Sequence, residues 1–258
     1  MTDETEPSGH PGANAPAMRT STPVAGVVLV LAKAPVAGRV KTRLLPATTP
    51  EGAAGIAAAA LLDTLDAARA VPGTRVVVAL EGDPAAAERA PELADALAGT
   101  VVVPQRGHTL GERITAAHAD VAALFPGAAC VQIGMDTPQV DPGLLIDALG
   151  LVAGVGGAAD AALGLARDGG WWALALADPR LAGVVGEVPT SRGDTGRRTL
   201  AALRAGHPGL DPGRVLELPP LVDVDTPGDA VFVADLVPTG RFARAVADLL
   251  PVPGGLSR

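Results

Sequence analysis

The 258-residue sequence contains only one cysteine, Cys130, which excludes a disulfide within the chain. Cys130 lies in the apolar stretch 128–133, where we expect a buried and unreactive thiol rather than a nucleophile. The first residues lack a basic segment followed by an apolar stretch, so they do not resemble a secretory signal. Both absences are typical of a cytoplasmic protein, which is our prediction.

Long apolar runs and positive charge are also scarce. Glycine and charged residues interrupt each apolar segment well before the roughly 18 residues that a membrane span needs, so we predict no membrane span. The formal net charge is −8, which argues against nucleic acid as a partner because phosphate contacts need a basic face. An anionic ligand must therefore meet a local group of basic residues.

Three common catalytic signatures are missing as well. The four histidines show no metal-ligand spacing, which argues against a zinc site. No G-x-S-x-G sequence is present, so a serine hydrolase would lack its nucleophile turn. The P-loop pattern GxxxxGK[ST] is absent, so any phosphate-binding loop must be of another kind.

The composition predicts a folded domain with terminal extensions. Hydrophobic residues make up 48% of the chain, which is enough for a full core. Residues 1–24 are polar and rich in proline, serine and threonine, so we expect a disordered N-terminal tail. We expect residues 25–250 to form a single domain and residues 251–258 to form a flexible C-terminus.

From residue 25 onward, short runs of valine, leucine and isoleucine alternate with alanine-rich stretches of helical length. The expected strands are 26–32, 74–80, 100–103, 129–133 and 161–166. The expected helices between them are 50–70, 83–98, 110–125 and 141–152. Later elements are a strand over 171–176, a helix over 195–205, a strand over 214–218 and C-terminal helices. This order predicts an α/β fold with a doubly wound, mostly parallel sheet, in which ligands bind beyond the carboxyl ends of the strands.

The loop that follows the first strand contains four basic residues and a glycine. Both lysines of the chain, Lys33 and Lys41, lie in this loop, although the chain has eighteen arginines. Together with Arg39 and Arg43 they can bind phosphate groups, while Gly38 lets the backbone approach. The alternative is a solvated basic turn. We expect Lys41 to be exposed and to contribute little to stability.

Carboxylates follow two other strands of the predicted sheet. Asp136 comes after the strand 129–133, where it either binds a divalent metal ion next to a phosphate group or caps a turn. Asp223 and Asp225 lie two residues apart, on one side of an extended segment, which also suits a metal ion. The alternative for Asp225 is that it caps the next helix.

A further carboxylate, Asp168, precedes two glycines and the only tryptophans of the chain, Trp171 and Trp172. The glycines permit a tight hairpin or a close approach of the backbone to a ligand. A tryptophan here can form one wall of a substrate pocket. The alternative is a simple hairpin with buried tryptophans.

The chain resembles a family of bacterial GT-A-fold glycosyltransferases, the selenodomain-associated transferases. The resemblance runs over residues 26–235 and is carried, in order, by AKAPVAGRVKTRL, GxxLGER, IGMDTP, DGGWW and DVDTP. More distantly, the KTRL loop and the DVDTP sequence are similar to phospholactate, phosphoenolpyruvate and molybdenum-cofactor guanylyltransferases. The resemblance implies a nucleotide-diphospho-sugar transferase (GT-A, Rossmann-like) fold.

The resemblance also implies site residues. The resemblance places Gly38, Arg39, Lys41 and Arg43 on the nucleotide phosphates. We add Lys33 to this set because it is a basic residue of the same loop. The same resemblance places Asp136 on Mg²⁺ or Mn²⁺, and the comparison with nucleotidyltransferases adds Asp225 as a second metal ligand. Gly111 would approach the nucleotide or shape the turn before the next helix.

We therefore predict a metal-dependent transferase that uses a nucleotide-activated donor. The leading reaction is glycosyl transfer from a nucleotide sugar to a small-molecule acceptor, with Lys41 offsetting charge on the diphosphate and Asp168 acting as base. One alternative is a nucleotidyltransferase that attaches a nucleotide from a nucleoside triphosphate to a small phosphorylated metabolite, because Asp136 lacks an Asp-x-Asp context. Another alternative is a catalytically silent nucleotide-binding protein. The sequence gives no prediction of the oligomeric state.

Overall fold

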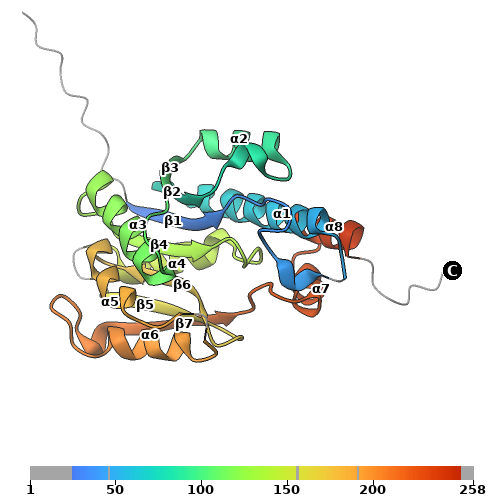
Figure 1. The fold of residues 1–258 in the computed structure, drawn as a ribbon. Helices are drawn as coiled ribbons and strands as arrows, with labels where there is room; N and C mark the ends of the chain where they lie inside the picture. Colours follow the sequence, from blue (N-terminus) through green and yellow to red (C-terminus); the bar gives the residue numbers. More distant parts are fainter. Residues whose placement is uncertain (1–24, 46, 155–156, 191, 251–258) are drawn as a thin grey trace, which may run out of the picture.

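The computed structural model describes residues 25–250 except 46, 155–156 and 191. The two expected tails, 1–24 and 251–258, lie outside the described residues. Within the described part, the chain forms one seven-stranded sheet with helices on both faces (Figure 1). No helix in this part has the length and low polarity that crossing a membrane requires.

The sheet has the strand order β3-β2-β1-β4-β6-β5-β7. Its strands are β1 (Gly26–Lys33), β2 (Thr74–Glu81), β3 (Val101–Pro104), β4 (Cys130–Gly134), β5 (Ala161–Ala166), β6 (Trp171–Leu176) and β7 (Val215–Leu221). Strand β6 pairs antiparallel with both of its neighbours, while the remaining pairs are parallel. The predicted mostly parallel, doubly wound sheet is confirmed. Its order reverses between β1 and β4, where such sheets bind ligands.

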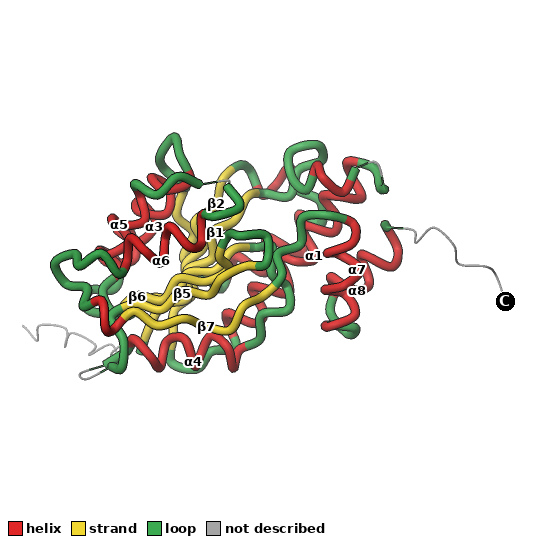
Figure 2. The backbone as a smooth tube through the Cα atoms, turned by 90° about the horizontal axis from the view of Figure 1, so that it is seen from below, coloured by secondary structure: helices red, strands yellow, loops and turns green. Residues whose placement is uncertain are grey.

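Helices cover both faces of the sheet. They are α1 (Pro50–Arg69), α2 (Ala90–Ala98), α3 (Leu110–Leu124), α4 (Pro142–Val152), α5 (Gly183–Gly186), α6 (Thr195–Leu203), α7 (Pro227–Leu236) and α8 (Arg241–Leu249). Because side chains alternate along a strand, Val28 of β1 packs with α1, α2 and α4, whereas Leu29 packs with α3. Helices α5 and α6 lie on the α3 side, and α7 and α8 group with α1 (Figure 2).

The expected helix over 83–98 is wrong in its first half. Asp83 caps only a short 3₁₀ turn, Pro84–Ala86, and α2 begins at Ala90 after Arg89 in a left-handed conformation. The reason is Pro91, which lacks an N–H donor and whose ring would clash with the carbonyl of Ala87 in a continuous helix. Proline is therefore tolerated in the first turn of α2 but not within a continuous helix.

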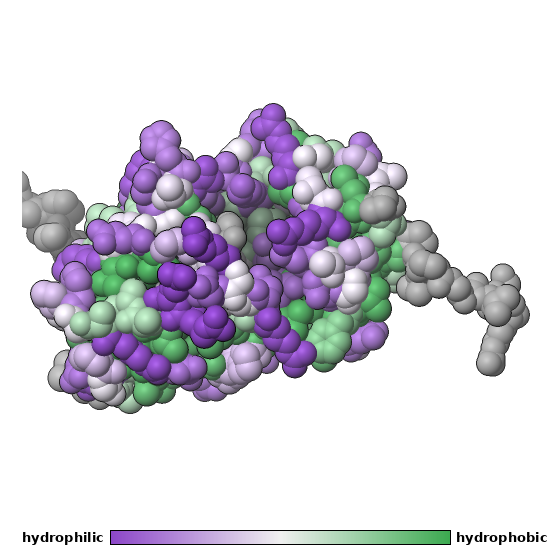
Figure 3. All heavy atoms as spheres, turned by 60° about the horizontal axis from the view of Figure 1, so that its bottom comes forward, coloured by the Kyte–Doolittle hydropathy of each residue, from purple (hydrophilic) through white to green (hydrophobic). Residues whose placement is uncertain are grey.

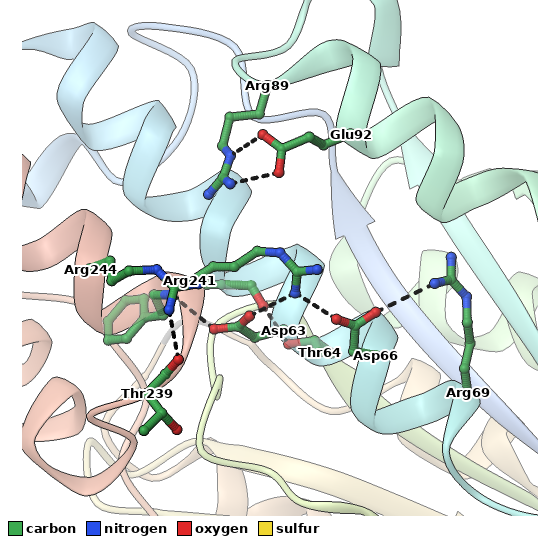
Figure 4. Close-up of polar contacts among 11 residues, drawn as sticks. Asp63, Thr64, Asp66, Arg69, Arg89, Glu92, Thr239, Arg241 and Arg244 are labelled. Atoms are coloured by element: carbon green, nitrogen blue, oxygen red, sulfur yellow. Dashed lines mark hydrogen bonds and ion pairs between the residues drawn. The ribbon is translucent and has the colours of Figure 1, made fainter.

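Ion pairs hold α8 against α1 (Figure 4). The Nη1 atom of Arg241 lies 3.1 Å from Oδ1 of Asp63 and 2.5 Å from Oδ2 of Asp66. The backbone N–H of Phe242 donates to Asp63 over 2.8 Å, which satisfies one of the free amides at the start of α8. Phe242 itself is fully buried, so this contact closes the α1, α7 and α8 core.

Cys130 is fully buried in β4, as expected. Burial strongly raises the pKa of its thiol, so the nucleophilic thiolate is disfavoured. The prediction of a buried thiol is confirmed, and Cys130 serves as a small core residue.

Candidate functional site

A cavity of about 920 Å³ opens at the carboxyl edge of the sheet, across the switch point between β1 and β4. Figure 3 shows this hollow with hydrophilic side chains gathered around it. The lining comes from the segments that follow β1, β4, β5 and β7, together with the starts of α3 and α6. Four segments that are far apart in the sequence therefore meet at one place, as the order of the elements predicted.

Lys41 lies at the centre of the contacts between these segments. Its side chain is only 7% exposed, and its Nζ atom lies 2.7 Å from Oδ1 of Asp136 and 3.7 Å from Oδ1 of Asp225. The ammonium group also donates a hydrogen bond to the backbone oxygen of Val224. The expectation of an exposed Lys41 is therefore wrong: the basic loop folds back onto two carboxylates, and its ammonium is engaged by them in this structure.

The backbone of Lys41 is strained. Its φ is 49°, in the left-handed region that residues with a β-carbon adopt at a cost of about 1–2 kcal/mol. Lys41 directly precedes the 3₁₀ turn Thr42–Leu44, whose Leu44 is fully buried. Burial of Leu44 and the ion pairs of Lys41 hold this conformation in place, as is common at functional sites.

The other basic residues of the loop differ in their surroundings. Lys33 pairs with Glu81 at 3.2 Å, and Arg43 donates a hydrogen bond to Oδ2 of Asp225 at 2.8 Å. Arg39 lines the cavity, is exposed, and makes no ion pair with another described residue. Arg39, like Arg192, is therefore a guanidinium of the lining that a phosphate group can reach without breaking an ion pair between described residues.

Asp136 and Asp225 converge on Lys41, as their positions after two strands predicted. Oδ1 of Asp136 and Oδ1 of Asp225 lie 2.7 Å and 3.7 Å from the same Nζ atom of Lys41, so the two carboxylates lie close to each other. The side chain of Asp136 makes no hydrogen bond to the backbone of another described residue, which argues against its alternative as a turn cap. Helix α7 is capped by Thr226 in a capping box with Asp229, so the alternative that Asp225 caps this helix is wrong.

Backbone contacts join the segments that carry the two carboxylates. The N–H of Val224 donates to the backbone oxygen of Asp136 over 2.9 Å. The side-chain amide of Gln139 donates to the backbone oxygen of Val222 over 2.6 Å. These two bonds fix the segment after β4 against the segment after β7 and so set the separation of Asp136 from Asp225.

Four carboxylates lie close enough in the cavity to affect one another, although six basic residues also line it, namely Lys33, Arg39, Lys41, Arg43, Arg113 and Arg192. Asp168 and Asp223 line it together with Asp136 and Asp225. The pKa of Asp223 is raised to about 8, first because burial removes water from the carboxylate and then because Asp136 and Asp168 repel its charge. An added cation would relieve this repulsion.

The donor set suits a divalent cation. Carboxylate oxygens are the ligands that Mg²⁺ and Mn²⁺ prefer, and such sites are commonly completed by substrate phosphates. Among the described residues, no group of three or more histidines, cysteines or acids is already arranged around one point. The donor set therefore fits an ion that Asp136 and Asp225 share with a ligand.

The segment that carries Asp168 forms a tight hairpin between β5 and β6. Oδ1 of Asp168 accepts a hydrogen bond from the N–H of Gly170 at 2.7 Å, so this carboxylate stabilises the turn. Trp172 is buried, and its Nε1 donates to the oxygen of Pro219, while Trp171 lines the cavity. The tight hairpin is thus present, but Trp171 is only half-buried, and Asp168 and both tryptophans line the cavity, so the alternative of a simple hairpin with buried tryptophans does not account for this segment.

Glycines allow the hairpin to pack against the start of α6. A Cβ at Gly169 would lie 2.0 Å from the oxygen of Gly193, and one at Gly196 would lie 2.2 Å from the oxygen of Gly170. The N–H of Gly196 also donates to the oxygen of Gly169 over 2.8 Å. This contact between backbones fixes Asp168 at the rim of the cavity.

Gly196→Ala should therefore destabilise the protein by about 2–3 kcal/mol, because the backbone of the hairpin must move away from the new methyl group. Urea denaturation measures this loss. The control is Gly183→Ala in α5, where a Cβ meets nothing within 4 Å and alanine favours the helix. Equal midpoints for the two variants would contradict the packing described above.

The two predicted nucleotide-binding glycines do not line the cavity. Gly38 has a φ of +74° and makes the turn between Val36 and Arg39. Gly111 is buried, and a Cβ there would lie 2.4 Å from the backbone oxygen of Gly186. Its lack of a side chain lets α3 approach α5, so Gly111 has a packing role and we no longer place it on the nucleotide.

Sequence reasoning missed Gln132, a cavity residue in the middle of β4 that is 2% exposed. Its Oε1 lies 2.9 Å from Nε2 of His118, which is fully buried in α3. Burial lowers the pKa of His118 to about 4, so the imidazole is neutral at pH 7 and donates this hydrogen bond. A polar residue within the apolar run Cys130–Gly134 was the available signal.

The lowered pKa of His118 predicts a loss of stability in mild acid. The unfolded chain takes up a proton below pH 6.5, whereas the folded chain does so only near pH 4. The contribution of the neutral His118 side chain to the free energy of unfolding is fully present above pH 6.5 and is about 2 kcal/mol smaller at pH 5. The raised pKa of Asp223 acts in the opposite direction over this range, so the loss is measured as the difference between the parent chain and His118→Gln in urea denaturation at the two pH values. The same pH dependence in both proteins would contradict the prediction.

The fold and the site define a class of protein. A crystal structure from Desulfovibrio desulfuricans G20, of a protein provisionally assigned as a nucleotide-diphospho-sugar transferase, matches with a TM-score of 0.67 and 25% identity. The match covers 86% of this chain and 97% of that one. The chain therefore has the nucleotide-diphospho-sugar transferase fold, as the sequence resemblance implied.

Two further structures share the fold at lower identity. A cytidylyltransferase from Leptospira borgpetersenii serovar Hardjo-bovis matches with a TM-score of 0.52 and 12% identity, over 90% of this chain and 100% of that one. A 4-diphosphocytidyl-2C-methyl-D-erythritol synthase from Anaerococcus prevotii matches with a TM-score of 0.52 and 11% identity, over 83% and 97%.

The family follows from the sequence itself. A family model described as "Uncharacterized protein conserved in bacteria (DUF2064)" matches residues 64–192, which is half of the chain, and the chain belongs to this family. No curated protein gives a significant match.

Proposed function

We propose that the chain is a metal-dependent transferase of the selenodomain-associated type that moves a glycosyl group from a nucleotide sugar to a small acceptor. The observation that carries this proposal is the convergence of Arg39, Lys41, Asp136 and Asp225 on one cavity at the switch point of the sheet. The similarity to the protein provisionally assigned as a nucleotide-diphospho-sugar transferase supports the nucleotide-sugar donor.

In this proposal, the diphosphate of the donor lies between Arg39 and the Lys41 ammonium. Asp136 and Asp225 would hold Mg²⁺ or Mn²⁺, which supplies positive charge next to the diphosphate when it is bound. Lys41 keeps the two carboxylates at a fixed separation, and Arg39 binds phosphate oxygens from the mouth of the cavity. The negative charge that develops on the leaving nucleoside diphosphate is thereby stabilised.

Asp168 is the proposed base. One of its oxygens, Oδ1, is held by the N–H of Gly170, which fixes the orientation of the carboxylate. In the reaction the acceptor hydroxyl oxygen forms a bond to the sugar carbon, the bond from that carbon to the diphosphate breaks, and the hydroxyl proton passes to Asp168.

A second candidate is nucleotidyl transfer from a nucleoside triphosphate. The observation that favours it is that Asp136 and Asp225 come from two separate segments rather than from one Asp-x-Asp sequence. The fold shared with a cytidylyltransferase is consistent with this candidate. Lys33, which pairs with Glu81, can turn to the longer triphosphate of this donor.

A ligand screen tests both candidates. Nucleoside triphosphates and nucleotide sugars are added to the chain with and without Mn²⁺, and the melting temperature is recorded. A ligand at about 100 times its Kd stabilises by about 2.7 kcal/mol, a shift of several degrees. Products are then analysed: a nucleoside diphosphate supports glycosyl transfer, whereas pyrophosphate supports nucleotidyl transfer. No shift with any nucleotide would contradict both, and a shift without turnover would favour a silent binder.

A further inference from the structure

Gln132 is a buried residue whose side-chain oxygen makes a hydrogen bond and whose side-chain nitrogen makes none with another described residue. Its Oε1 accepts a hydrogen bond from His118, whereas its Nε2 makes no hydrogen bond with another described residue. Gln132 nevertheless lines the cavity, although it is only 2% exposed. Its Nε2 is not among the fully buried atoms that lack a partner, so the amide nitrogen is accessible from the cavity and can donate to a ligand.

The surroundings of Gln132 are apolar or already satisfied. Gln132 pairs across the sheet with Leu174, on the face that packs against Ile114 of α3. The nearby hydroxyl of Thr199 also lines the cavity and donates to the oxygen of Thr195 at 2.9 Å. The amide of Gln132 is therefore a polar group of the cavity lining that still has a donor to offer.

We propose that the part of this cavity lined by Gln132 of β4 and Trp171 of β6 is a subsite for an uncharged hydroxylated group such as a sugar ring. In this subsite, the Nε2 group of Gln132 donates to a hydroxyl oxygen and Trp171 packs against the apolar face of the ring. The inference rests on the proposed function and narrows it, because it assigns this part of the cavity to a neutral sugar or polyol rather than a phosphorylated metabolite.

The surroundings of the Gln132 amide carry this choice. It contacts the neutral imidazole of His118 and makes no hydrogen bond to a cation among the described residues, while the basic side chains of the lining come from the end of β1 and the loop after it, from α3 and from the segment before α6. On α3, Arg113 is already paired with Glu81. A phosphate or carboxylate beside the amide would need a cation supplied by one of those segments, whereas a hydroxyl requires only hydrogen bonds.

Tryptophan fluorescence of the full chain tests the subsite, because both tryptophans lie in β6 and Trp171 lines the cavity. The probes are glucose, mannose, galactose and glycerol, and their anionic counterparts glucose 6-phosphate, mannose 6-phosphate, galactose 1-phosphate and glycerol 3-phosphate. We expect at least one uncharged probe to bind, and its phosphorylated counterpart to bind at least about tenfold more weakly. Tighter binding of the phosphorylated forms, or no binding of any uncharged probe, would overturn the inference.

Two variants locate the contact. Gln132→Met, close in volume, should weaken sugar binding about tenfold through the lost hydrogen bond and leave nucleotide affinity with Mn²⁺ unchanged. The control is Thr64→Val, which also removes a buried polar group but lies in α1 away from the cavity. Unchanged sugar affinity in Gln132→Met would overturn the inference. Loss of nucleotide binding in the parent chain would instead count against the proposed function.

Discussion

Asp136→Asn should abolish the metal-dependent part of nucleotide binding and leave the fold intact. Asparagine is nearly isosteric with aspartate but lacks the charge that Mg²⁺ or Mn²⁺ requires in a site with few protein ligands. We expect the parent chain to bind nucleotide at least about tenfold more tightly with Mn²⁺ than without, and the variant to lose this difference. Titration calorimetry with and without Mn²⁺ measures both affinities.

The reciprocal measurement strengthens this test. If metal and nucleotide bind cooperatively, nucleotide must increase the affinity for Mn²⁺ by the same factor as Mn²⁺ increases the affinity for nucleotide. The control is Asp235→Asn on α7, which makes the same charge change at an exposed residue that does not line the cavity. Metal-dependent binding that survives in Asp136→Asn would remove Asp136 from the metal site and favour the silent nucleotide-binding protein.

The fold and the meeting of the strand ends could be predicted from the sequence, for a physical reason. Parallel strands joined by helices place their carboxyl ends at one edge, so the pattern of apolar runs brings Asp136 to the loop after β1. The approach of Asp225 followed from the resemblance and from the paired carboxylates near the C-terminus. Neither argument depends on where a single side chain points.

Details that depend on side-chain contacts could not be predicted in this way. The burial of Lys41 depends on Val224, which lies 183 residues further along the chain. Gly111 is required by the oxygen of Gly186, another distant contact. The break before α2 is different, because Pro91 was visible in the sequence and a proline is tolerated in the first turn of a helix but not within a continuous one.

The ion pairs of Lys41 predict that its loss destabilises the fold as well as the site. Lys41→Ala would leave Asp136 and Asp225 without their shared ammonium, although their side chains are 44% and 34% exposed and are partly hydrated. This exposure reduces the loss below that of a fully buried pair, to about 1–3 kcal/mol. Urea denaturation measures the loss, and a double-mutant cycle with Asp136→Asn isolates the pair.

A glycine variant separates the loss of the Lys41 ion pairs from the strain in the Lys41 backbone. Because the φ of Lys41 is 49°, Lys41→Gly loses the same ion pairs but relaxes the left-handed backbone, so it should be about 1 kcal/mol more stable than Lys41→Ala. Lys41→Arg keeps the charge but replaces a compact ammonium with a planar group, and it should restore nucleotide affinity only in part. Parent-like stability in Lys41→Ala would show that the carboxylates do not need this cation. Full nucleotide affinity in the same variant would leave Arg39 as the phosphate ligand of the loop.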